Sequence, residues 1–342
     1  MVFLLAAALL IFPGGTLRAD SPIPLLQKPQ RPEAQAGPTK IGYAVYIADI
    51  TRIDSSTQTF QANFMLILHW KDPRLAHPDP GVREYALADV WAPPILFENQ
   101  TRDLVRSLPE IVTVAPDGTV VYRQRFIGEF SQSLDLSAFP FDKGTFRIRL
   151  VTPGYPPGDL CFIPDPKAIT LGMKSGIGIN THLSESDWNI LSTETSSQPF
   201  IIYPSLQVAG CSFAFTAKRN STYFVIKVIL PLLLIVMMSW AVFWIDPTDA
   251  SAQFSIAATA MLTLIAYRFA IDANVPKLPY LTCLDEFVLF SSLLVFVTLT
   301  QAIITSKLAK RGDLELARTI DRCCRWIFPL IFCVITSIIL FV

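Results

Sequence analysis

The chain has 342 residues, of which 51% are hydrophobic and 16% charged, and its formal net charge at pH 7 is zero. This length suggests two domains, and the balanced net charge gives no electrostatic case for nucleic-acid binding. Apolar residues concentrate after Tyr223, whereas most of the 26 prolines come before it. The composition therefore indicates a first part rich in turns and a second part in a membrane.

The N-terminal segment has features of a secretory signal peptide. An apolar run from Met1 to Phe12 is followed by Pro13 and then by the small residue Ala19. This pattern predicts a signal peptide over residues 1–19, so that the next part is exported. A fifth membrane helix is the alternative, but the run is too short to cross about 30 Å of hydrocarbon. Residues 20–40 are rich in Pro, Gln and Lys and predict an extended lead-in.

Residues 41–219 have the alternating pattern of short β-strands. Apolar side chains alternate along Phe60–Trp70, as in a strand with one buried face. Asp117-Gly118 separates two apolar runs and predicts a hairpin. Two later strands, Trp188–Thr195 and Leu206–Phe215, are expected to pair with each other. Strands at this spacing predict an immunoglobulin-like β-sandwich.

The cysteines and histidines form no recognisable chemical site. Cys161 and Cys211 lie in the exported part, where a disulfide is permitted, but the sequence does not show whether they meet. No nucleophile–base set, metal-ligand cluster or phosphate loop occurs. We therefore expect neither an enzyme nor a cofactor or metal site.

Four apolar runs after Arg219 are long enough to cross a membrane. We expect helices over about residues 222–245, 251–271, 284–306 and 319–342. The segment between the third and fourth helices is rich in Lys and Arg, and the positive-inside rule places it in the cytoplasm. Four spans then place the sandwich and the C-terminus on the outer side, in agreement with the signal peptide. The predicted fold class is α+β with two domains, a β-sandwich over 41–219 and a four-helix membrane bundle over 220–342.

The second membrane helix carries a partly polar stripe. Its members follow one another in steps of three or four residues, which places them on one helix face: Ser255, Thr259, Leu262, Ala266 and Phe269. Hydroxyls without a partner are costly in lipid, so this face is better explained if it meets water. The alternative is an ordinary bundle helix whose hydroxyls bond to their own backbone.

Several motifs, taken in order, resemble those of the pentameric ligand-gated ion channels, the Cys-loop receptor superfamily. They comprise Trp70–Leu75, Trp91–Pro94, the loop Leu134–Asp142 with its Phe-Pro-Phe-Asp sequence, Arg219, Pro231 and Asn274–Tyr280. Animal members carry two cysteines around the Phe-Pro-Phe-Asp loop, where this chain has Gln132 and Phe146. The missing bridge and the short cytoplasmic linker make the chain similar to the prokaryotic branch.

The resemblance implies a homopentamer with a pore lined by the second helix. Rings of Ser255 and Thr259 would replace part of an ion's hydration shell, and rings of Leu262, Ala266 and Phe269 would form an apolar constriction that closes by dewetting. The expected function is a ligand- or pH-gated channel for small inorganic ions in the bacterial inner membrane, in contact with lipid. The alternative is a non-conducting receptor anchored by the same helices.

Charges at the two pore mouths favour cations over anions. Asp249 at the inner end and Asp272 at the outer end would raise the local cation concentration. Anions remain the alternative, because the inner end, Ser251-Ala252-Gln253, has no acidic ring. Arg268 lies one residue off the stripe, and its candidate partners are Asp272 four residues on and, on the third helix, Asp285 and Glu286.

The resemblance also implies a gating interface and a ligand site. The interface residues are Asp54, Phe139, Pro140, Phe141, Asp142, Arg219, Pro276 and Lys277, with a bidentate pair between Arg219 and a carboxylate. The ligand site between neighbouring sandwiches is expected to contain Phe97, Tyr155, Phe200, Tyr203 and Met65. Aromatic walls bind ammonium ligands. Many relatives have an aromatic residue where this chain has Met65, which argues against an amine ligand. Protons are therefore the other candidate stimulus.

Overall fold

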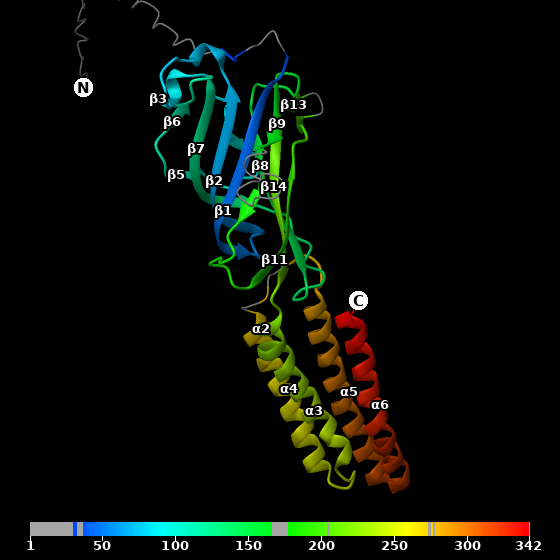
Figure 1. The fold of residues 1–342 in the computed structure, drawn as a ribbon. Helices are drawn as coiled ribbons and strands as arrows, with labels where there is room; N and C mark the ends of the chain where they lie inside the picture. The colour runs from blue at the N-terminus through cyan, green and yellow to red at the C-terminus, as the bar shows by residue number, and fades with distance from the viewer. Residues whose placement is uncertain are drawn as a thin grey trace, which may run out of the picture.

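The computed structural model describes residues 30–32, 37–165, 177–203, 206–272, 275 and 278–341. The predicted signal peptide and most of the predicted lead-in lie outside these ranges. Within the lead-in, Nη1 of Arg31 donates to the carbonyl of Asp159 (2.8 Å), which ties this residue to the sandwich. A β-rich part is followed by long helices that extend away from it (Figure 1).

The β-rich part contains two main sheets. An 8-stranded sheet has the order β10-β1-β2-β7-β6-β3, with β5 paired to β7 and β9 paired to β1, and a 4-stranded sheet has the order β11-β14-β8-β4. The strands are β1 (Thr39–Asp54), β2 (Thr59–Lys71), β3 (Arg83–Ala86), β4 (Leu96–Phe97), β5 (Val105–Arg106), β6 (Ile111–Val114), β7 (Thr119–Ser131), β8 (Lys143–Val151), β9 (Leu160–Pro164), β10 (Ile177–Ile179), β11 (Trp188–Ser196), β12 (Phe200–Tyr203), β13 (Leu206–Val208) and β14 (Gly210–Arg219). The predicted sandwich is confirmed.

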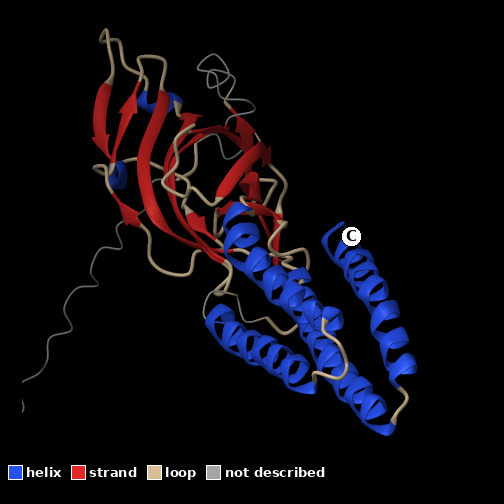
Figure 2. Ribbon diagram, turned by 90° about the horizontal axis from the view of Figure 1, so that it is seen from below, coloured by secondary structure: helices blue, strands red, loops and turns tan. Residues whose placement is uncertain are grey.

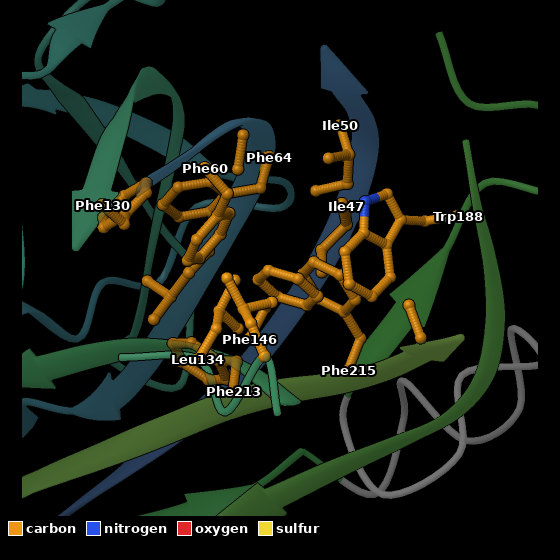
Figure 3. Close-up of a cluster of buried hydrophobic side chains, with 14 of the residues drawn as sticks. Ile47, Ile50, Phe60, Phe64, Phe130, Leu134, Phe146, Trp188, Phe213 and Phe215 are labelled. Atoms are coloured by element: carbon orange, nitrogen blue, oxygen red, sulfur yellow. The ribbon is translucent and has the colours of Figure 1, made fainter. Parts of the chain in front are cut away.

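Aromatic side chains fill the space between the two sheets. Phe60 on β2 meets Phe146 on β8 edge to face with ring centroids 5.4 Å apart, and Phe146 stacks on Phe215 of β14 at 5.0 Å. Trp188 on β11 covers Phe146 at 5.3 Å (Figure 3). Such rings bury large apolar areas and prefer these geometries, so they hold the sheets together without the bridge of the animal proteins.

The last strands differ in part from the expected pair. β11 and β14 pair antiparallel as predicted, but Leu206–Val208 pairs with Phe200–Tyr203 in a separate hairpin, β12–β13. The apolar positions change from even numbers (Leu206, Val208) to odd numbers (Cys211, Phe213, Phe215) across Ala209-Gly210, and this change of phase marks the division. Strand β14 of the 4-stranded sheet begins at Gly210. A larger residue does not fit there, because its Cβ would lie 2.4 Å from the carbonyl oxygen of Leu150.

Four helical segments are long and apolar enough to cross a membrane. The first combines α2 (Thr222–Phe224), the π-helix η3 (Val225–Ile229), α3 (Leu230–Trp240) and the 3₁₀ turn η4 (Ala241–Trp244), and the others are α4 (Ala250–Asp272), α5 (Cys283–Arg311) and α6 (Leu314–Phe341). Figure 2 shows the helices grouped on one side and the strands on the other. The C-terminus lies at the end of α6 nearest the sandwich (Figure 1), as four spans require.

The connection between α5 and α6 is shorter than we predicted from the Lys- and Arg-rich segment between the third and fourth apolar runs. The prediction ended one helix near 306 and began the next near 319, whereas α5 continues to Arg311 and α6 begins at Leu314. Lys and Arg near a C-terminus stabilise a helix rather than end it. Gly312, with φ of 97°, ends α5, and the N–H groups of Gly312 and Asp313 donate to its last carbonyls.

Candidate functional site

Helix α4 has one face against its own chain and an opposite face without cover. The buried residues are Gln253, Ala257, Ala260, Leu264 and Ile271. The exposed residues include every member of the predicted stripe, Ser255, Thr259, Leu262, Ala266 and Phe269. Leu262 is 69% exposed and Phe269 is 76% exposed. No other helix of the described chain covers this stripe.

The uncovered stripe of α4 differs in chemistry from the exposed face of α6. On α6 the outward residues are apolar, for example Trp326, Leu330 and Ile338, as expected of a lipid-facing helix. The stripe of α4 instead begins with two hydroxyls. The hydroxyl of Thr259 donates to the carbonyl of Ser255 at 2.7 Å, the backbone bond expected of an ordinary bundle helix, but Thr259 remains exposed.

The acidic residues near the ends of α4 differ in their bonding. Asp249 is exposed, and its Oδ1 accepts the N–H of Ala252 (3.1 Å) at the start of the helix. Asp272 and Arg268 are both exposed, and the described part of the chain shows no ion pair between them. The predicted Arg268–Asp272 pair is thus not formed in this conformation. Asp285, another candidate partner, instead completes a capping box with Thr282 at the start of α5.

Gln253 lies behind the exposed stripe, not at the inner mouth where the sequence placed it. Its side chain is buried, and Nε2 donates to the carbonyl of Ile245 (3.0 Å) and to Oδ2 of Asp321 (3.5 Å). Nε2 of Gln301 donates to the other oxygen of Asp321. Asp321 is only 1% exposed. One buried carboxylate on α6 therefore joins α4 to α5, and sequence reasoning missed it because its partners lie on other helices.

We expect Asp321→Leu to lower the stability of the helix bundle. The substitution leaves two buried amide groups without their acceptor, and losing hydrogen bonds to a charged group costs about 1.5–3 kcal/mol. Asp321→Asn keeps one acceptor oxygen and should have a smaller effect. Heating purified assemblies of the parent and both variants and measuring the intact fraction by size-exclusion chromatography would rank them. Equal loss for both variants would show that the negative charge matters here rather than a single acceptor oxygen, because Asn has nearly the volume of Asp.

The second cluster lies where the sandwich meets the first membrane helix. Nε and Nη2 of Arg219 donate to the two carboxylate oxygens of Asp142 at 2.8 and 3.1 Å. The guanidinium also lies over the rings of Trp188 (4.3 Å) and Phe139 (4.9 Å). Arg219 is 8% exposed and Asp142 is 3% exposed. This bidentate pair is largely removed from water, where its strength depends on complete pairing.

Asp54 does not join this pair. Its carboxylate binds Arg52 at 2.5 Å and accepts the N–H groups of Ser56 and Thr57. The neighbouring hydroxyl of Ser55 accepts from Nη2 of Arg219 at 2.7 Å instead. Burial raises the pKa of Asp54, but the bonds from Thr57 and Ser56 and the charge of Arg52 outweigh it and hold that pKa below its usual value.

The loop between β7 and β8 is attached directly to the start of α5. The N–H groups of Cys283 and Leu284 donate to the carbonyls of Ser137 (2.9 Å) and Phe139 (3.2 Å). The N–H of Leu136 donates to the hydroxyl of Tyr280 at 3.1 Å. First-turn N–H groups have no partner inside their own helix. The loop therefore supplies the acceptors that α5 needs.

The aromatic and proline residues of this loop lie at different depths. Phe139 is buried, and its ring meets Phe224 of the first membrane helix edge to face at 4.8 Å. Pro140 is buried and Phe141 half-buried. Two further interface residues from the sequence, Pro276 and Lys277, lie outside the described residues. Backbone bonds such as those to Ser137 have no side-chain signal, so the sequence could not show them.

A cavity of about 620 Å³ lies beside the tryptophan-proline segment of the sandwich. Nε1 of Trp91 donates to the hydroxyl of Tyr155 at 3.1 Å, with the rings edge to face. Tyr122 adds a third ring, and Arg106 and Glu110, which form an ion pair, add opposite charges. The cavity therefore offers aromatic walls to a cation and charged groups to either end of a polar molecule.

The predicted ligand residues are not brought together within one chain. Phe97 is 2% exposed and packs among Phe64, Phe126 and Phe130, so it belongs to the core rather than to a binding wall. Met65 and Phe200 are half-buried, but neither lines the cavity described above. The side chain of Tyr203 lies outside the described residues. Alternation along the strand could have shown the inward orientation of Phe97.

The two cysteines of the sandwich are not bridged. Cys161 on β9 is exposed, Cys211 on β14 is buried, and both are free thiols. Burial raises the pKa of Cys211 well above its usual value. The sandwich therefore keeps its form through aromatic packing and strand pairing.

Comparison with known proteins agrees with this architecture. Residues 24–221 match the profile of the neurotransmitter-gated ion-channel ligand binding domain, and residues 228–315 match that of the corresponding transmembrane region. The chain is 28% identical over 312 residues to a proton-gated ion channel of Gloeobacter violaceus, an alignment that covers 89% of this chain and 83% of the relative.

Subunits of animal receptors are also similar. The identity over 280 residues is 24% to the gamma-aminobutyric acid receptor subunit beta-4 of Gallus gallus and 28% to subunit rho-3 of Homo sapiens. Both alignments cover 79% of this chain but only 56% and 58% of the relatives, so the chain spans little more than half of their length. The chain therefore belongs to the family of pentameric, neurotransmitter-gated ion channels, which are multi-pass membrane proteins with an extracellular ligand-binding domain and not enzymes.

Proposed function

We propose that the chain forms a homopentameric channel of the bacterial inner membrane, in which five α4 helices surround a pore for small inorganic ions. The observation that carries this proposal is the uncovered stripe of α4, where the exposed residues Ser255 and Thr259 offer a polar surface to water and ions. Ser255 and Thr259 form the polar inner half of the pore. Leu262, Ala266 and Phe269 form the apolar outer half, where a narrow passage can lose its water and stop ions.

The permeant ion is proposed to be a cation. Asp249 and Asp272 place one ring of carboxylates at each end of α4, and such rings raise the local cation concentration. Anion selectivity is the second candidate, supported by the exposed Arg268 and by the lack of an acidic residue at positions 251–253. Reversal potentials measured with unequal NaCl on the two sides decide between them. A cation-selective channel and an anion-selective channel shift the reversal potential in opposite directions.

The stimulus is proposed to act on the sandwich and to reach α4 through the junction around Arg219. A small polar ligand fits the cavity beside Trp91 and Tyr155, and protons are the other candidate because a bacterial relative is proton-gated. The route from the sandwich runs through the loop that binds both Arg219 and the start of α5. Current recorded during steps of external pH, without added ligand, separates the two stimuli.

We expect charged thiol reagents to reach Ser255→Cys and Thr259→Cys from the water phase and to change the current. The background should carry alanine at the exposed native cysteines Cys161, Cys323 and Cys333. A positively charged methanethiosulfonate would add a fixed charge to each ring and lower cation current at least severalfold. Leu330→Cys, on the apolar face of α6, is the matched control and should not respond. Reaction at position 330 together with none at 255 and 259 would refute the assignment of α4 to the pore.

A further inference from the structure

The first membrane helix contains a proline that removes one of its own hydrogen-bond donors. Pro231 has no N–H, so the carbonyl four residues earlier, that of Lys227, lacks the donor that a regular α-helix would supply. The helix is also widened at this point, because Val225–Ile229 form a π-helix and the N–H of Leu230 donates to the carbonyl of Val225. In a membrane no bulk water is present to satisfy such a carbonyl.

The missing donor is replaced from the neighbouring helix. The hydroxyl of Tyr267 on α4 donates to the carbonyl of Lys227 at 2.8 Å and to that of Val228 at 3.1 Å. Tyr267 is half-buried, whereas its neighbours Ala266 and Phe269 are exposed on the stripe. One turn of α4 thus presents apolar groups outward and a single hydroxyl to the widened turn of the first helix.

We propose that Tyr267 is a positioning residue for the outer half of the pore. Its hydroxyl replaces the donor that Pro231 removes and thereby links the angle of α4 to the widened turn before α3. The inference rests on the proposed function, since it matters for conduction only if α4 lines the pore. The first helix continues directly from β14 and Arg219, so a movement of the sandwich that shifts this turn also shifts Ala266 and Phe269.

The link makes a specific prediction about two substitutions together. Tyr267→Phe keeps the ring and removes the hydroxyl, and we expect the stimulus for half-maximal current to change at least threefold. Pro231→Ala restores an N–H that can donate to the carbonyl of Lys227. In that background the hydroxyl is no longer needed, so adding Tyr267→Phe should change the half-activating stimulus less than 1.5-fold. A double-mutant cycle measures this coupling between the two positions. Pro231→Leu restores the same N–H and replaces Pro231→Ala if the alanine variant assembles poorly.

A second readout separates this inference from the proposed function. The melting temperature of the purified assembly should fall for Tyr267→Phe in the parent and stay nearly constant when the substitution is added to Pro231→Ala. Tyr223→Phe is the matched control, because the hydroxyl of Tyr223 makes no hydrogen bond within the described residues. Additive effects of the two substitutions on both current and melting temperature would overturn the link. Coupled melting temperatures without any current would support the link and refute the channel.

Discussion

Replacing Leu262 by serine should open the channel at a weaker stimulus or leave a standing current without any stimulus. In a homopentamer the change places five hydroxyls at the inner end of the apolar half of the pore, where water then remains. With five copies, each hydroxyl needs to stabilise the water-filled pore by only about 0.3 kcal/mol to reach the 1.4 kcal/mol that corresponds to a tenfold change. We expect the half-activating stimulus to fall at least tenfold, measured as current in oocytes or proteoliposomes.

This result would report on the pore and not on folding. Leu262 is 69% exposed, so its removal costs little packing inside one subunit. Leu330→Ser makes the same chemical change on the lipid-facing side of α6 and should leave activation unchanged. A Leu262→Ser channel with the activation curve of the parent would show that the gate lies elsewhere on α4.

Replacing Arg219 by alanine should have the largest effect on assembly. It would leave the carboxylate of Asp142, only 3% exposed, without its partner, and removing one member of a buried ion pair costs roughly 3–5 kcal/mol. Arg219→Lys restores the charge but not the bidentate geometry or the bond to Ser55, so it should rescue only in part. We expect the amount of intact pentamer at the membrane, and its melting temperature, to decrease from the parent to the Lys variant and further to the Ala variant.

The partner residue and a neighbour supply the controls. Combining Arg219→Met with Asp142→Leu removes both charges and should cost less than Arg219→Ala alone, because no unpaired carboxylate remains. Lys218→Ala removes an exposed cation from the adjacent position and should leave assembly unchanged. An Arg219→Ala protein as stable as the Lys218→Ala protein would show that this junction tolerates the loss of its ion pair.

The junction explains how the two domains can act together without the disulfide of the animal proteins. The loop between β7 and β8 binds Arg219 through Asp142, the first membrane helix through Phe139 and the start of α5 through backbone carbonyls. Three elements thus meet on one loop, each through contacts that water does not replace. This one loop therefore contacts two membrane helices, the first and α5.

Periodic patterns determined much of this protein from the sequence alone. The alternation along Phe60–Trp70, the long apolar runs and the spacing from Ser255 to Phe269 each depend only on the local geometry of a strand or a helix. These patterns predicted the sandwich and the four helices, and they placed the stripe of α4 on one face. A bidentate pair between Arg219 and a carboxylate followed from a resemblance in motifs, and the structure identifies the carboxylate as that of Asp142.

Only the tertiary structure decided contacts between elements far apart in the chain. Asp321 with its two glutamines, Tyr267 on the carbonyl of Lys227 and Ser55 in place of Asp54 all require two or more elements to be placed in space. Phe97 was expected at a ligand site because of the resemblance in motifs, but its side chain packs in the core of the sandwich. A hydrogen bond needs its partners within about 3 Å, and that proximity is set by packing between elements rather than by the period of any one of them.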